Sequence, residues 1–111
     1  MTRITTHVLD TGTGRPAAGI PVRLERVDGP RADAVAAAVT DADGRVRDWL
    51  PGGIPSGRYR LVFETGDWFR AAGRESLYPE IVIDFAAEES VSHYHLPLLL
   101  APYGYSTYRG S

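Results

Sequence analysis

Apolar and polar residues alternate along most of this chain, and Gly or Pro interrupts the alternation at short intervals. Near the N-terminus, Ile4, Thr6 and Val8 share one face, whereas His7 and Leu9 share the other. Alternation with a period of two is typical of a β-strand that buries one face. We therefore predict a strand at the start of the chain whose first set of side chains points into a core.

The same period recurs in most of the segments that follow. Strands are predicted over residues 2–9, 21–27, 33–39, 58–64, 78–85, 91–100 and 103–109, with a short strand after the turn at 41–45. Residues 33–39 are rich in alanine, which favours helix, but their valines, short length and strand neighbours favour a strand. Residues 66–74 are the best helix candidate, with Asp67 as N-cap and Gly73 as the stop signal.

Seven or eight short strands with one short helix indicate an all-β fold. No repeat, linker or low-complexity stretch divides the chain, so we expect residues 1–111 to form a single domain. Short strands separated by turns are typical of an antiparallel β-sandwich of two sheets.

Composition excludes several classes of partner. The chain has 111 residues, a formal net charge of −2 and no cysteine. That charge offers no basic field for nucleic acid or for an anionic membrane surface. No stretch approaches the roughly 20 apolar residues that cross a bilayer, and the N-terminus lacks the apolar core of a signal peptide. We expect a cytoplasmic protein, with a bacterial source indicated by its richness in Ala, Gly and Arg.

The three histidines carry the candidate chemistry. Strand alternation places His7, His95 and Tyr108 on the outer face of a sheet. Leu9 and Leu99 share that face and make it partly apolar. An outer face that mixes leucine with histidine suggests a contact between subunits.

Taken singly, these residues have ordinary explanations. His93 and His95 stand at a spacing that a metal could use, but without cysteine or a nearby carboxylate pattern we predict no zinc site. Arg45 follows a turn glycine, where a surface arginine is common, and residues 109–111 could be a frayed end. No nucleophile elbow or phosphate-binding loop is present.

The two ends of the chain are more specific than any residue in them. THVLDTGTGRPAAGIPVRL (6–24) and HYHLPLLLAPYGYSTYRGS (93–111) resemble the 5-hydroxyisourate hydrolase family, the transthyretin-like enzymes of urate breakdown. The closing YGYSTYRGS is the most characteristic motif of the family, and transthyretin itself lacks the histidines and this ending. The resemblance implies a transthyretin-like (prealbumin-like) sandwich and a homotetramer, a dimer of dimers with active sites at the dimer–dimer interface. It implies no cofactor.

The family motifs also imply a set of site residues in this chain. The catalytic residues implied are His7, Arg45, His95 and Ser111. The substrate-binding residues implied are Tyr108, Arg109 and Gly110. The resemblance does not say whether His93 has a role.

The implied reaction is hydrolysis of a cyclic amide bond in 5-hydroxyisourate, which gives 2-oxo-4-hydroxy-4-carboxy-5-ureidoimidazoline. Histidine titrates near neutral pH, so His7 and His95 suit the general base and general acid, in an order that the sequence leaves open. Arg45 would orient the substrate and stabilise the oxyanion. Ser111, through its hydroxyl or its carboxylate, would position water or substrate, and Tyr108 would shape the pocket.

Two other functions compete with this one. A non-catalytic transthyretin-like carrier would hold a small ligand in the same channel, although histidines and the Tyr-Arg-Gly-Ser ending argue against it. A purely structural sandwich is also compatible with the fold, because a fold does not dictate a function.

Overall fold

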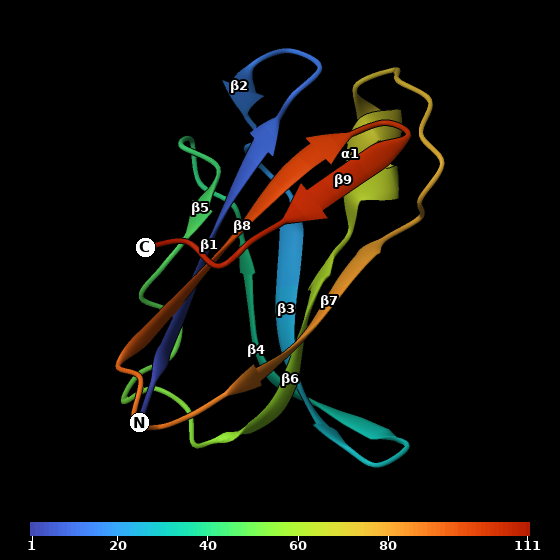
Figure 1. Cartoon of the computed structure of the whole chain (residues 1–111). Helices are drawn as coiled ribbons and strands as arrows, with labels where there is room; N and C mark the ends of the chain where they lie inside the picture. The colour runs from blue at the N-terminus through green and yellow to red at the C-terminus, as the bar shows by residue number, and fades with distance from the viewer.

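Two β-sheets face each other in the computed structural model, which describes residues 1–111 (Figure 1). The first sheet contains β1 (Arg3–Asp10), β2 (Arg15–Pro16), β5 (Arg45–Val46), β8 (His93–Ala101) and β9 (Gly104–Thr107). The second contains β3 (Pro21–Asp28), β4 (Arg31–Val39), β6 (Gly57–Phe63) and β7 (Ile81–Ala87). The single helix, α1 (Thr65–Ala71), joins β6 to β7, and no helix is long and apolar enough to span a membrane.

The predicted all-β sandwich is confirmed, and the seven longer strands are all present, including the alanine-rich β4. The prediction for the start of the helix is wrong, because α1 begins two residues before Asp67 and its N-cap is Glu64. The backbone of Gly66 explains the difference: its N–H donates to the Pro79 carbonyl at 3.0 Å, which holds this turn directly after β6. Gly73 has a φ of 71° and lies just beyond the C-cap, as its role as a stop signal requires.

The core lies between the sheets and contains 19 buried hydrophobic residues. In β1, Ile4 and Val8 are buried, as the alternation predicts. Thr6 shares their face and is also buried. Its hydroxyl donates a hydrogen bond to the Leu96 carbonyl at 2.6 Å, so this buried polar group has a partner. The apolar face of β8 is also buried: Tyr94, Leu96, Leu98 and Leu100.

β1 and β8 are neighbours in the middle of the first sheet and run parallel, although every other pair of strands is antiparallel. The predicted antiparallel sandwich therefore contains one parallel pair of strands. The ladder sets Thr5 opposite His95 and His7 opposite Pro97. It therefore brings the two ends of the chain side by side.

β9 is shorter than the predicted strand at residues 103–109. The antiparallel register pairs Leu98 with Thr107, and the next partner on β8 would be Pro97, which has no N–H to donate. The Thr107 hydroxyl instead donates to the Pro97 carbonyl at 2.7 Å. The chain then rejoins β8 in the same register, where Gly110 bridges His95.

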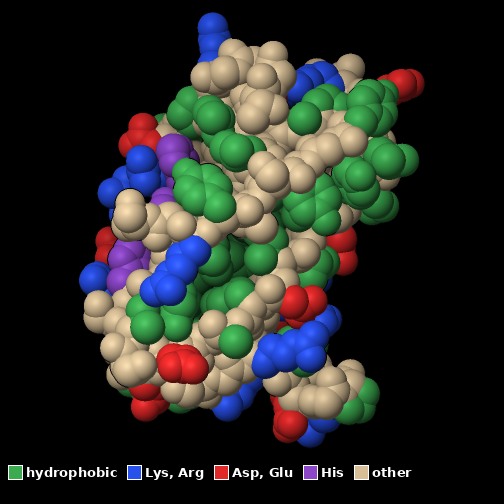
Figure 2. Space-filling model, in the orientation of Figure 1, with side chains coloured by type: hydrophobic (Ala, Val, Ile, Leu, Met, Phe, Trp, Pro, Cys, Tyr) green, Lys and Arg blue, Asp and Glu red, His purple; other side chains and the backbone are tan.

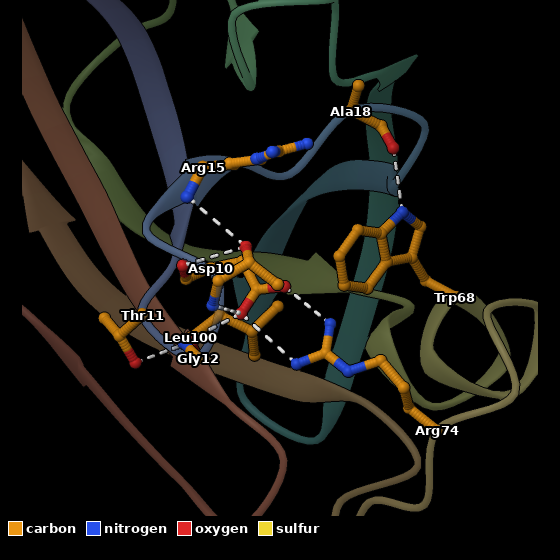
Figure 3. A network of polar contacts seen from close by, with 9 residues as sticks. Asp10, Thr11, Gly12, Arg15, Ala18, Trp68, Arg74 and Leu100 are labelled. Atoms are coloured by element: carbon orange, nitrogen blue, oxygen red, sulfur yellow. Dashed lines mark hydrogen bonds and ion pairs between the residues drawn. The ribbon is translucent and has the colours of Figure 1, made fainter.

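A buried ion pair fastens the end of β1 to the loop after α1 (Figure 3). The Asp10 side chain is 2% exposed, and Arg74 donates to its Oδ2 at 2.6 Å. The Gly12 N–H also donates to Asp10 at 3.0 Å, which orders the turn after β1. The hydrogen bond from Arg74 is the main cause that lowers the pKa of Asp10 below its usual value. The Arg74 guanidinium also lies 4.8 Å from the centre of the Phe69 ring, against the helix.

We expect Arg74→Met to lower the free energy of unfolding at neutral pH by about 3 kcal/mol, because it leaves a buried carboxylate without its cation. This is the low end of the cost of breaking a buried pair, since the Arg74 side chain is itself 28% exposed. Since the folded-state pKa of Asp10 is lowered, the stabilisation is complete above its unfolded pKa of about 3.9. It is lost as the pH falls through the folded pKa. Urea unfolding at several pH values measures the effect.

The control is Arg58→Met, which removes an exposed pair with Asp84 at 3.7 Å and should change the stability by less than about 1 kcal/mol. Equal losses in the two variants, or a loss for Arg74→Met that does not shrink in acid, would contradict the account of Asp10.

Candidate active site

A polar cavity of about 340 Å³ opens beside the N-terminal half of β1. Ten residues line it, and only Val46 among them is hydrophobic. The lining residues are Arg3, Thr5, Thr6, Arg45, Val46, Arg47, Asp48, His93, His95 and Ser111. Figure 2 shows the histidine side chains together with basic side chains on this flank of the molecule. The volume falls at the lower end of the range for small-ligand sites, about 300–1,000 Å³.

Pairing of β1 with β8 positions the two strands' polar side chains. Thr5 and His95 are direct partners in the parallel ladder, and both are half-buried on the outer face of the sheet. The Thr5 hydroxyl lies 2.8 Å from Nδ1 of His95 and 2.7 Å from Nε2 of His93. His7 lies two residues further along β1, beside the cavity but outside its lining.

A tight turn brings Arg45 to the same place. β5 pairs with β1 so that Arg45 stands opposite His7. Gly44 has a φ of 74°, and a Cβ there would lie 2.4 Å from the Val8 carbonyl oxygen, so the close approach of this turn to β1 requires glycine. The Asp41 carboxylate accepts hydrogen bonds from the backbone N–H groups of Asp43 and Arg45 and orders the turn. No carboxylate pairs with the Arg45 guanidinium, which stays available to a ligand.

His95 is the one histidine whose environment clearly changes its titration. Burial lowers the pKa of the His95 imidazole below its usual value, and the positive charge of Arg45 lowers it further. His93 and His7 act in the same direction. His95 is therefore largely neutral at neutral pH, the form in which an imidazole can accept a proton.

The last residues of the chain are held against His95. The Gly110 N–H donates to the His95 carbonyl at 2.7 Å. A Cβ on Gly110 would lie 2.6 Å from Cδ2 of the His95 ring, so only glycine lets the terminal segment pass this close. Ser111 follows and reaches the cavity wall.

The seven site residues predicted from the sequence do not all meet in one chain. Arg45, His95 and Ser111 line the cavity, whereas His7, Tyr108, Arg109 and Gly110 do not. In the register of the terminal segment, Arg109 stands opposite Leu96, on the core side of the sheet. Its guanidinium lies 4.9 Å from the centre of the Tyr94 ring, which is on that side too. Substrate binding by Tyr108 and Arg109 stays a prediction that the geometry of one chain does not support.

Sequence patterns did not select six of the ten residues that line the cavity, and they leave the role of His93 open. The six are Arg3, Thr5, Thr6, Val46, Arg47 and Asp48. Strand alternation offered a signal for Thr5, because it shares the outer face with His7. Arg47 lies just past β5 and lacked any such signal. No group of three or more His, Cys, Asp or Glu residues is placed to hold a metal ion.

Comparison with known proteins adds to this geometry. The model of the HIUase/Transthyretin family matches residues 4–110. A 5-hydroxyisourate hydrolase of Caulobacter vibrioides is 48% identical over 115 residues, and the match covers 100% of both chains. The structure of Klebsiella pneumoniae 5-hydroxyisourate hydrolase is similar with a TM-score of 0.90 and 47% identity, over 100% of both chains. Transthyretin from Sparus aurata has a TM-score of 0.91 but 26% identity, and the match covers 99% of this chain and 97% of that one. The chain therefore belongs to the HIUase/Transthyretin family.

Proposed function

We propose that this protein is an enzyme that hydrolyses 5-hydroxyisourate to 2-oxo-4-hydroxy-4-carboxy-5-ureidoimidazoline, a step of purine catabolism. The observation that carries the proposal is the polar cavity in which a neutral His95, an unpaired Arg45 and Ser111 converge. The substrate is a small, planar heterocycle with several carbonyl groups. A cavity lined by nine polar residues and one hydrophobic residue suits such a molecule.

The reaction needs three things from the protein. Water must lose a proton as its oxygen bonds to the ring carbonyl carbon, the resulting oxyanion must be stabilised, and the departing ring nitrogen must gain a proton when the C–N bond breaks. Positioned acids and bases typically contribute about 10²–10⁴-fold to the rate of such steps.

We assign the general base to His95. It lines the cavity, and its lowered pKa keeps it neutral where the water would be held. His7 lies outside the lining in one chain, beside Arg45 on the neighbouring strand, and suits the support of Arg45.

Arg45 provides the positive charge. Its guanidinium is permanently charged, presents a planar fork of donors and has no carboxylate partner, so it can hold the substrate oxygens and stabilise the oxyanion. Ser111 lies on the same cavity wall and would orient the attacking water or the ring.

The carrier function is less well supported. A carrier of an apolar aromatic ligand needs an apolar lining, and this cavity presents three arginines and two histidines instead. The full-length relative at 48% identity is a 5-hydroxyisourate hydrolase, whereas the transthyretin neighbour shares 26% of its residues with this chain.

The test is to generate 5-hydroxyisourate from urate with urate oxidase, add the protein and follow the ultraviolet absorbance. We expect decay far faster than the spontaneous rate, and a fall of about 10²–10⁴-fold in kcat for His95→Gln because the general base is lost. Arg60→Gln, on the opposite sheet, is the control and should keep the full rate. A decay that saturating protein does not accelerate would refute the hydrolase, and full activity in His95→Gln would refute the site.

The functional form is a homotetramer, a dimer of dimers with the sites at the dimer–dimer interface. Leu9 and Leu99 are only half-buried on the outer face that carries the site, and Tyr108, which the register of the terminal segment places on the same face, is 56% exposed. Apolar surface of this kind around a polar cavity suits a subunit contact. A chain without cysteine also suits the reducing cytoplasm, where we place the enzyme.

Sedimentation equilibrium tests the assembly. We expect the mass of four chains at micromolar concentration. Replacing Leu99 by Glu would place an unpaired charge in the contact, so this variant should dissociate and lose activity together. A wild-type protein that sediments as one chain while hydrolysing the substrate at full rate would contradict the tetramer.

A further inference from the structure

One threonine hydroxyl lies between two imidazoles at the edge of the cavity. Oγ1 of Thr5 is 2.7 Å from Nε2 of His93 and 2.8 Å from Nδ1 of His95. The two rings are on the same face of β8, with their centres 6.3 Å apart. His93 is exposed to water, whereas His95 is half-buried.

Hydrogen-bond counting shows that the proton positions on the two rings are linked. A hydroxyl has one hydrogen to donate and two lone pairs that accept, and a neutral imidazole has one donor and one acceptor nitrogen. Thr5 therefore cannot donate to both rings. If both rings donated, its own O–H would have no acceptor in the chain, since these are the only hydrogen bonds of its side chain.

Two arrangements satisfy every group. In the first, Nδ1–H of His95 donates to Thr5, and Thr5 donates to Nε2 of His93, which leaves Nε2 of His95 without a proton. In the second, Nε2–H of His93 donates to Thr5, and Thr5 donates to Nδ1 of His95, so Nε2 of His95 must carry the proton. A protonated His93 has two donors and no acceptor, and it therefore imposes the second arrangement.

Nε2 is the nitrogen of His95 that is left for a ligand. Nδ1 is held by Thr5, and the Cδ2 edge of the ring packs against Gly110. Nε2 makes no hydrogen bond to the protein. The first arrangement thus prepares His95 as a base toward the cavity, and the second prepares it as an acid.

We propose that His93, Thr5 and His95 form a proton relay in which Thr5 is a positioning residue and His93 is the outer proton acceptor. This inference rests on the hydrolase function proposed above. Nε2 of His95 takes a proton from the attacking water, the Nδ1 proton passes to Thr5, and the Thr5 proton passes to Nε2 of His93. His95 is then neutral with a proton on Nε2, which it gives to the departing nitrogen, and the return of the proton from His93 through Thr5 restores the starting state.

The charges around the relay favour moving the positive charge outward. The groups that face the two rings are Arg3 and His7 from β1, Arg45 from β5, Arg47 and Asp48 after β5, and Ser111. Cations predominate in this set, and the charge of Arg45 acts directly on His95. A positive charge on exposed His93 is hydrated by water, whereas the same charge on His95 is partly desolvated.

The test is nitrogen-15 NMR of the imidazoles across about pH 5 to 8, the range in which histidine titrates. The chain contains only three histidines, so their ring signals can be separated. In the wild type, we expect protonation of His93 and the transfer of the His95 proton from Nδ1 to Nε2 to follow one common apparent pKa. In Thr5→Val the two events should separate, and in Thr5→Ser, which keeps the hydroxyl, they should remain joined.

Kinetics give the second readout. We expect Thr5→Val to lower kcat by about 10- to 100-fold with little change in KM, because an imidazole in the wrong tautomer is a poor base. Thr5→Ser should stay within about threefold of the wild type, and backbone spectra verify that both variants fold. The relay would be overturned if the His95 proton stayed on the same nitrogen in the wild type while His93 gained its proton. An unchanged kcat in Thr5→Val would also overturn it. Either result would leave the proposed hydrolase function intact. A wild type with linked tautomers and no hydrolysis would overturn the proposed function, and the relay step with it.

Discussion

The parallel ladder between β1 and β8 joins residues 90 positions apart in the sequence, and the site depends on it. The ladder sets Thr5 beside His95. It places His7 two residues further along β1, on the same face of the sheet. β5 then pairs with the other edge of β1 and presents Arg45 opposite His7. A shift of the β1–β8 register by one residue would send these side chains to the core face. The buried apolar face of β8 prevents that shift, so the packing of the core also fixes the chemistry outside it.

The electrostatics of the site follow from its position on the outer face. The cavity holds three arginines and one acidic side chain, and its base is a histidine with a lowered pKa. One set of charges thus has two effects, because it attracts the oxygens of a polar substrate and keeps His95 neutral. Glycine is needed twice for this arrangement: at Gly44, where the turn meets β1, and at Gly110, where the terminal segment meets His95.

Strand alternation predicted the fold because burial of one face is the strongest local signal in a two-layer sandwich. It assigned Ile4 and Val8 to the core and His7 and His95 to the outer face, and the structure agrees. It did not reveal that β1 and β8 run parallel, since pairing between distant strands leaves no local pattern. The helix start at Asp67 was wrong because a backbone hydrogen bond between Gly66 and Pro79 decides it.

The candidate site was predictable where a motif carried it and not elsewhere. The family motifs selected Arg45, His95 and Ser111, which line the cavity. They gave no sign that Arg109 packs on Tyr94, on the opposite face of the sheet. Thr5 passed unnoticed because a threonine in a strand is ordinary; its position between two imidazoles becomes visible only in three dimensions.

Catalysis in this enzyme is expected to depend on how the His95 ring is held between Thr5 and the terminal segment. Gly110→Ala tests it most directly, because this variant removes no functional atom yet places a Cβ 2.6 Å from Cδ2 of the ring. Gly104→Ala is the matched control, since a Cβ there has no neighbour within 4 Å. For the hydrolysis of 5-hydroxyisourate, the account predicts that Gly110→Ala lowers kcat by about 10- to 100-fold, as misplacement of a reacting group does. Gly104→Ala should keep the full rate. Full activity in a folded Gly110→Ala protein would contradict the account.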